Sequence, residues 1–128
     1  MSQARPVYSV DEARALLPEI RATLLQLAIE RRRADAAHDE LHRGLRSGTG
    51  RAEQARLEAS TEELNVRVRD LIDHLESLGV VLRDLDAGLV DIPTVRQGEP
   101  AWLCWRLADP ELGFWHTTRE GFATRRPL

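Results

Sequence analysis

The sequence predicts an α+β protein in which a long antiparallel two-helix hairpin is followed by a small antiparallel β-meander. Two observations predict this fold class. Apolar residues recur at steps of three and four over residues 9–46 and again over residues 51–78, which is the period of helices that pack along their length. From residue 80 onward the apolar period falls to two, as in β-strands. The 128 residues have the length of one domain, so we treat residues 1–128 as a single domain whose sheet and tail span residues 80–128.

The first helix begins with a capping signal. Ser9 and Glu12 stand three residues apart, so each side chain can bond the other's backbone amide, and Tyr8 can pack on the first turn. Pro18 lies beyond the first turn, where its missing N–H is expected to bend or divide the helix. The apolar seam of this helix consists of Ala13, Leu17, Ile20, Leu24, Leu27, Ala34, His38, Leu41 and Leu45.

A tight turn is predicted over residues 47–50, where small residues break the helical period. The second helix is expected over residues 51–78, with Gly79 as the left-handed residue that ends it. Because the linker is short, the two helices must run antiparallel. Each helix covers only half of the other's apolar stripe, so we expect a homodimer in which the helices of a second copy complete a four-helix bundle.

The C-terminal third predicts an antiparallel sheet of three or four strands. The expected strands are residues 80–85, 89–92, 102–107 and 112–117. Pro93 is expected to stop the second strand because proline cannot donate to a ladder. The last two strands form a hairpin with a loop of ordinary length, and the tail is expected to pack back over the sheet through Phe122.

Composition and charge exclude several classes of protein. The net charge is −3 at pH 7 and both signs of charge are interspersed, so we expect no nucleic-acid-binding surface. The single cysteine excludes an intrachain disulfide and fits a reducing compartment. Residues 1–10 lack the pattern of a signal peptide, and no apolar run approaches the roughly 20 residues of a membrane helix. We therefore expect a cytoplasmic protein without a membrane partner.

Three segments of the chain form a recognisable pattern. They are Tyr8-Ser9-Val10-Asp11-Glu12-Ala13-Arg14-Ala15-Leu16-Leu17-Pro18; Leu78-Gly79-Val80 with Asp84-Leu85-Asp86-Ala87-Gly88-Leu89-Val90-Asp91-Ile92-Pro93; and Leu103-Cys104-Trp105-Arg106, Pro110-Glu111, Phe114-Trp115-His116, Gly121-Phe122-Ala123 and Arg125-Arg126-Pro127-Leu128. Through them nearly the whole chain resembles DUF2203, a family of small bacterial proteins of unknown function. Similar sequences often have an acidic residue where this one has Thr117, so we build no site on that position. The resemblance implies no reaction, substrate or partner.

Four residues of the C-terminal third have side chains suited to a metal site: His116, Cys104, Glu111 and Glu120. Histidine, cysteine and carboxylate ligands fit a borderline divalent ion such as zinc or iron. In the alternative interpretation, Cys104 is a small buried apolar residue and His116 is hydrogen-bonded to a carboxylate such as Glu111 or Asp91.

The register of the last two strands decides whether Cys104 and His116 meet. We expect Leu107 to lie opposite Leu112. Cys104 then lies opposite Trp115, and His116 lies on the other face of the sheet, where it cannot share an ion with Cys104. A bulge or slip of one residue would bring the two side chains to the same face.

A second candidate site is an aromatic and basic surface on the sheet. Because side chains alternate along a strand, we expect the aromatic residues to divide between a face packed on the helices and a partly exposed face. Arginines at the rim of the exposed face can recognise an anion, or can pair with Glu111, Glu120 or the C-terminal carboxylate. The predicted ligand or partner surface consists of Trp102, Trp105, Arg106, Trp115 and Arg125.

A third and weaker candidate lies on the first helix. His38 and His42 are four residues apart, so both imidazoles share one helical face, a spacing that can bind zinc. Glu58 or Glu62 of the facing helix could supply another ligand. We favour the simpler interpretation, a polar interruption of the apolar seam.

These patterns lead to two functional hypotheses. In the first, which we favour, the chain is a homo-oligomeric interaction, assembly or small-ligand-binding module whose Trp-rich sheet binds a protein partner or a small anion. In the second, it is a metal-binding or catalytic protein that uses His116 with Glu111, Glu120 or Cys104. The sequence has no nucleophile elbow, phosphate-binding glycine loop or dinucleotide fingerprint, which argues against most cofactor-dependent enzymes.

Overall fold

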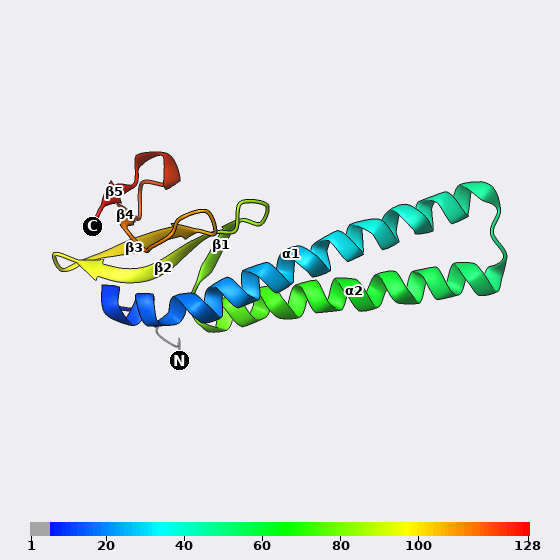
Figure 1. The fold of residues 1–128 in the computed structure, drawn as a ribbon, viewed down its shortest axis with the longest axis horizontal. Coiled ribbons are helices and arrows are strands. Elements are labelled where there is room, and N and C mark those ends of the chain that lie inside the picture. Colours follow the sequence, from blue (N-terminus) through cyan, green and yellow to red (C-terminus); the bar gives the residue numbers. More distant parts are fainter. Residues whose placement is uncertain (1–5) are drawn as a thin grey trace.

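The computed structural model describes residues 6–128 and has two parts, a long helical hairpin and a sheet that packs on one end of it (Figure 1). The helices are α1 (Val10–Ser47) and α2 (Arg51–Ser77). The strands are β1 (Val81–Asp84), β2 (Leu89–Arg96), β3 (Glu99–Arg106), β4 (Phe114–Thr117) and β5 (Arg126–Pro127), with a short 3-10 turn, η1 (Phe122–Thr124), in the tail. This arrangement confirms the predicted α+β class, and the sheet gains a fifth strand from the tail.

The predicted capping box forms at the start of α1. The Glu12 amide donates to Ser9 Oγ at 3.1 Å, and the Ser9 amide donates to Glu12 Oε1 at 2.9 Å. α1 then continues through Pro18 without a break. Pro18 and Arg14 are both exposed, so water can bond the Arg14 carbonyl that the proline leaves without an amide partner.

Glycines in the left-handed conformation follow both helices. Gly48 has φ 74° after α1, and Gly79 has φ 78° after α2, as predicted for the residue that ends the second helix. The linker of residues 48–50 returns the chain antiparallel, and the far end of the hairpin lies well away from the sheet (Figure 1). Within residues 6–128, neither helix combines the length and the apolar content that crossing a lipid bilayer requires.

The sheet is an antiparallel meander in the order β1-β2-β3-β4-β5. The prediction that Pro93 stops the second strand is wrong, since β2 runs on to Arg96. The Pro93 carbonyl accepts a hydrogen bond of 2.9 Å from the Tyr8 amide, so it points to the edge of β2 that faces away from β3. The N and O of one strand residue point to the same edge, so the N–H that proline lacks would also face Tyr8. No bond to β3 is lost, and β2 continues.

The register of β3 and β4 differs by one residue from the predicted register. Cys104 pairs with Phe114 and Trp102 pairs with His116, whereas we expected Cys104 opposite Trp115. The cause is the connection: β3 ends at Arg106, and residues 107–113 form a longer loop than expected. In that loop Asp109 closes a turn, with its amide donating to the Arg106 carbonyl at 2.9 Å. The slip places Cys104 and His116 on the same face of the sheet.

The two faces of the sheet have different surroundings. The helix-facing side presents Val90, Ile92, Leu103 and Trp105, which pack with the core of the hairpin. The opposite side, here called the outer face, carries Asp91, Trp102, Cys104, Phe114 and His116. The tail, coloured red in Figure 1, lies over this outer face. Both faces are therefore covered, although antiparallel sheets of this size often leave one face in water.

We predict that Trp105→Ala lowers the free energy of unfolding by about 3–5 kcal/mol, because Trp105 is fully buried between the sheet and the helices. Trp105→Phe should cost less, since it keeps the ring and removes an indole N–H that has no partner among the described residues. Urea unfolding followed by circular dichroism measures both. Leu45→Ala, at a side chain that is 59% exposed, is the control and should change stability little. Equal losses for Trp105→Ala and the control would contradict the packing described above.

Candidate metal centre

Three potential metal ligands lie together on the outer face of the sheet, at the centre of β2, β3 and β4. They are Asp91, Cys104 and His116, and their ligand atoms all lie within 4.8 Å of one another. Asp91 is directly opposite Cys104, and His116 is diagonal to Cys104 because it pairs with Trp102. All three side chains are buried. Cys104 and His116, two of the predicted ligands, therefore meet, and Asp91 supplies the carboxylate.

The His116 ring is held by a bond at each nitrogen. Nδ1 lies 2.8 Å from the Thr117 carbonyl oxygen, and Nε2 lies 2.9 Å from Asp91 Oδ1. A carbonyl oxygen only accepts, so Nδ1 must carry the proton in that bond. This is the arrangement of many metal-binding histidines, in which one ring nitrogen donates to the backbone and the other is directed at the ion. The ring therefore presents Nε2 to Asp91 and Cys104.

Asp91 is a buried carboxylate whose negative charge is balanced by Arg83, a residue of the edge strand β1. Its Oδ2 accepts a hydrogen bond of 2.8 Å from Arg83 Nε, and Oδ1 faces His116. Arg83 lies on β1, its side chain is 45% exposed, and its guanidinium stacks on Trp102 at 5.2 Å from the ring centroid. A buried charge without such partners would be strongly destabilising. The Asp91 oxygens are thus divided between an inner bond to His116 and an outer bond to Arg83.

Cys104 is a protonated thiol in the metal-free protein. Burial, and after it the charge of Asp91, raise its pKa to about 11, although the Arg125 guanidinium acts in the opposite direction. A thiol in this state is a poor nucleophile at neutral pH. A bound divalent cation would remove the proton, because a coordinating thiol is deprotonated by the ion itself. The environment of Cys104 argues against a free catalytic thiolate and is compatible with a metal ligand.

A cavity of about 350 Å³ opens above Asp91 and Cys104. Its walls come from β1, β2, β3 and the tail. The lining residues are Arg83, Leu89, Asp91, Cys104, Thr118, Glu120, Gly121 and Phe122. The ligand cluster is therefore not sealed in the core, and a small molecule can approach it from one side.

The two predicted carboxylate ligands lie at different places. Glu120 lines the cavity, but both of its oxygens accept bonds from Arg126 at 3.1–3.2 Å, and the Thr117 amide donates to it as well. The Thr117 amide is the largest influence that lowers the pKa of Glu120. Glu111 is exposed in the 107–113 loop and lines a separate cavity beside Leu17 of α1. The structure thus brings neither carboxylate into the three-residue cluster.

The five residues predicted as one ligand or partner surface do not share a face. Trp105 is buried in the core, and Trp115 lies on the helix-facing side between Arg96 and Arg126. Trp102 alone among the tryptophans is on the outer face. The cause is the strand alternation together with the shifted register, which separates odd-numbered from even-numbered positions of these strands.

Arg125 anchors the tail to the sheet. Its guanidinium makes two bonds to the Asp109 carboxylate, at 2.7 and 3.3 Å, and lies between the rings of Phe114 and Phe122 at 4.0 and 4.3 Å. Arg106 also bonds Asp109, through Nε at 3.4 Å. Pairing with a carboxylate was one of the two roles expected for these arginines, and Asp109 is the carboxylate that provides it.

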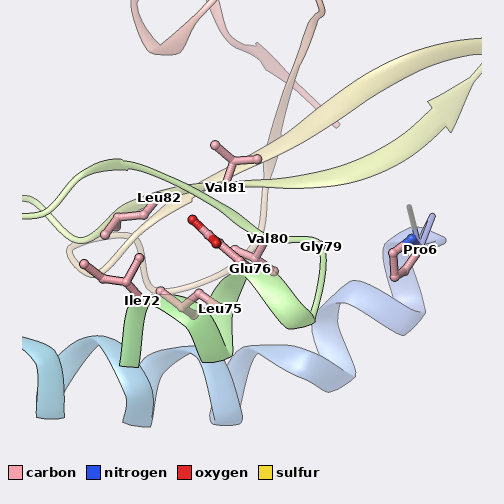
Figure 2. A pocket seen from close by; sticks show the side chains of 8 residues that line it. All are labelled: Pro6, Ile72, Leu75, Glu76, Gly79, Val80, Val81 and Leu82. Atoms are coloured by element: carbon pink, nitrogen blue, oxygen red, sulfur yellow. The ribbon is translucent and has the colours of Figure 1, made fainter. Parts of the chain in front are cut away.

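Two other places in the described part of the chain offer no ligand set. A cavity of about 600 Å³ lies between the end of α2 and β1, and among the described residues that line it Glu76 is the ionisable one (Figure 2). On α1, the rings of His38 and His42 meet edge to face with centroids 4.7 Å apart. Within residues 6–128, no third potential ligand lies close enough to join them.

Sequence reasoning missed Asp91 as a ligand and Arg83 as its partner. Asp91 was considered as a hydrogen-bond acceptor for His116, and the structure confirms that bond. The available signal was an acidic residue in the middle of the apolar strand Leu89-Val90-Asp91-Ile92. A carboxylate at such a position is rarely buried without a partner, so it marks a polar cluster in the sheet.

Comparison with known proteins identifies one family. A family model described as "Uncharacterized conserved protein (DUF2203)" matches residues 6–128. No curated protein and no solved structure matches the chain.

We predict that the Asp109–Arg125 pair stabilises the fold in a pH-dependent manner. Hydrogen bonding from Arg125 lowers the pKa of Asp109 from its ordinary 3.8, so the pair contributes above the pKa of the unfolded chain and loses its contribution as pH falls through the lowered value. Asp109→Asn should therefore cost about 1.5–3 kcal/mol at pH 7 and progressively less below pH 3.8. Urea unfolding at several pH values measures the difference. Asp73→Asn, at an exposed position of α2, is the control; a loss for Asp109→Asn that is the same at every pH would contradict the ion pair.

Proposed function

Because the chain belongs to the DUF2203 family, whose description assigns no activity, we propose a function from the outer-face cluster: the protein binds one divalent transition-metal ion through Asp91, Cys104 and His116. The observation that carries this proposal is the meeting of three buried ligand atoms of different chemistry within 4.8 Å. Each comes from a different paired strand, so their spacing is fixed by the sheet.

The ligand chemistry favours zinc or iron(II). One sulfur, one imidazole nitrogen and one carboxylate oxygen suit borderline ions, whereas calcium and magnesium prefer oxygen ligands. Around a tetrahedral zinc ion, ligand atoms lie roughly 3.3–3.8 Å apart, given bond lengths of about 2.0–2.3 Å. His116 Nε2 and Asp91 Oδ1, which are 2.9 Å apart, would have to separate slightly, and a pair of ligand atoms at the upper limit of 4.8 Å would have to approach by about 1 Å.

The bonds around the cluster are compatible with an ion in its centre. An ion between His116 Nε2 and Asp91 Oδ1 replaces the direct contact of these two atoms and leaves the Arg83 bond to Oδ2 in place. The carboxylate would then bind the ion through one oxygen and an arginine through the other, a common outer arrangement of metal-binding carboxylates. Arg83 bonds Asp91 and Arg125 acts on Cys104, so binding a cation here costs electrostatic energy, which deprotonation of Cys104 offsets.

Three protein ligands leave one position of a tetrahedral ion open. Structural zinc sites use four protein ligands, and sites that bind water or substrate use three. Among the described residues, no fourth ligand joins the cluster, and the open side faces the cavity of about 350 Å³. We infer a ligand-binding or catalytic type of centre. The earlier preference for a Trp-rich binding surface has less support, because its residues lie on different faces. A ligand thiol also requires a reducing environment, which favours the expected cytoplasmic location.

The test is elemental analysis of protein purified without a histidine tag and reconstituted with zinc or iron(II). We expect one equivalent of metal in the wild type and its loss in Cys104→Ala and His116→Ala. His38→Ala, at an exposed histidine of α1, is the matched control and should keep the metal. In cobalt-substituted protein, the sulfur-to-cobalt absorption should be absent from Cys104→Ala. Circular dichroism establishes that each variant is folded. A folded wild type that takes up no metal, or equal metal content in all variants, would refute the proposal.

We also propose that the protein forms a homodimer through its helices. Leu25 and Ile29, one turn apart on α1, are about half exposed and support an apolar contact with a second copy. Light scattering should give twice the chain mass of 14.5 kDa at micromolar concentration. Ile29→Glu should be monomeric with unchanged helix content. A monomeric wild type would remove the proposal without affecting the metal centre.

A further inference from the structure

We propose that the open position of this centre binds a small carboxylate, and that Arg83 holds the carboxylate against the ion. This inference rests on the metal-binding function proposed above and specifies the class of ligand. It follows from the charges around the cavity, from the position of Arg83 and from the shape and lining of the cavity.

The charges of the occupied centre leave Arg83 without compensation. A divalent ion, the Cys104 thiolate, the Asp91 carboxylate and a neutral imidazole sum to zero. Asp91 is the one hydrogen-bonded partner of Arg83 among the described residues. In the occupied centre the ion shares the charge of Asp91, so a single positive charge remains beside the open coordination position. A monoanion at that position restores neutrality.

The other charged groups near the cavity already have partners. Glu120 is paired with Arg126. Arg125 is paired with Asp109 and is largely buried. Asp109 also accepts a bond from Arg106, so it is shared between two arginines outside the lining of the cavity. Arg83 is thus the basic residue among the described residues that line the cavity, and its partner Asp91 is itself a proposed ligand of the ion.

Arg83 is also positioned to use its fork of donors. Nε is fixed on Asp91 at 2.8 Å and the guanidinium plane is supported by the Trp102 ring at 5.2 Å. Its two terminal nitrogens have no protein partner within residues 6–128, and the side chain lines the cavity together with Cys104. A guanidinium held in this way matches the planar geometry of a carboxylate.

The cavity size and walls limit what accompanies the carboxylate. A volume of about 350 Å³ is at the lower end of ligand pockets and exceeds what one water needs. Leu89 and Phe122 provide the large apolar side chains of the cavity wall. The ligand class that fits is a carboxylate with a short apolar chain, with the anion at the metal and Arg83 and the chain against Leu89 and Phe122.

The test uses the full chain loaded with cobalt(II), with acetate as the probe and acetamide as its neutral isostere. We expect acetate to change the visible cobalt spectrum saturably and acetamide to have no effect. Arg83→Gln should weaken acetate binding about tenfold or more, the loss expected for a charged hydrogen bond, while the cobalt content stays at one equivalent. Arg83→Lys, which keeps the charge and loses the fork, should weaken binding less. Arg32→Gln, on the exposed side of α1, is the matched control and should bind acetate as the wild type does.

The outcomes separate the two proposals. Cobalt binding without any response to acetate, or Arg83→Gln that binds acetate as tightly as the wild type, would overturn the carboxylate site and leave the metal centre standing. A folded protein that binds no cobalt would overturn both. If Arg83→Gln does not fold, the comparison of Arg83→Lys with Arg32→Gln decides, and equal acetate affinities would overturn the role of Arg83.

Discussion

The pairing of Trp102 with His116 determines which polar side chains meet on the outer face of the sheet. In that register, His116 and Cys104 point to the outer face and join Asp91 of the neighbouring strand. A shift by one residue would move His116 to the helix-facing side, where it would replace an apolar residue of the core and leave a polar ring without partners. Two interactions stabilise this register. The turn at Asp109 fixes the loop before β4, and the bond between His116 and Asp91 links β4 to β2 across the outer face. The site and the register therefore stabilise each other.

Burying a carboxylate, an imidazole and a thiol costs a sheet of this size desolvation free energy. Apolar residues of the same volume would pack the outer face without a desolvation cost, and replacing buried ion pairs in this way often leaves stability unchanged or improved. The protein instead retains a cluster whose outermost partner, Arg83, is half in water, next to a cavity. Polar clusters of this kind are concentrated at binding and catalytic sites, because there the same groups must be able to exchange partners. The cost is explained more simply by a ligand-binding role than by a role in folding.

The sequence predicted the helices and the class of the fold from local rules that the tertiary structure does not override. The Ser9–Glu12 capping box and the position of Gly79 are properties of a few neighbouring residues and were confirmed. The register of β3 and β4 depends on the loop between them, and the turn closed by Asp109 adds residues that no periodic pattern indicates. The prediction that Pro93 ends the second strand failed for a related reason. The effect of a proline depends on which neighbour faces its nitrogen, and that neighbour is Tyr8, far away in the sequence. The proposed metal ligands were therefore half predictable, as residue types but not as a set.

The tail shields the outer face of the sheet from water. An antiparallel sheet packed on a helical hairpin would ordinarily leave that face in water, where a histidine, a cysteine and an aspartate would interact weakly with one another and with any ion. Residues 118–128 cross it instead, fixed by the Arg125–Asp109 pair and by the stacking of that arginine between Phe114 and Phe122. Water is displaced over the cluster except at the cavity beside Glu120 and Phe122. Electrostatic interactions are stronger in such surroundings, so the charge of Arg83, whose side chain is 45% exposed, is screened less there than at an open surface. The hairpin packs on one face of the sheet, and the tail covers the other face, where the candidate site lies.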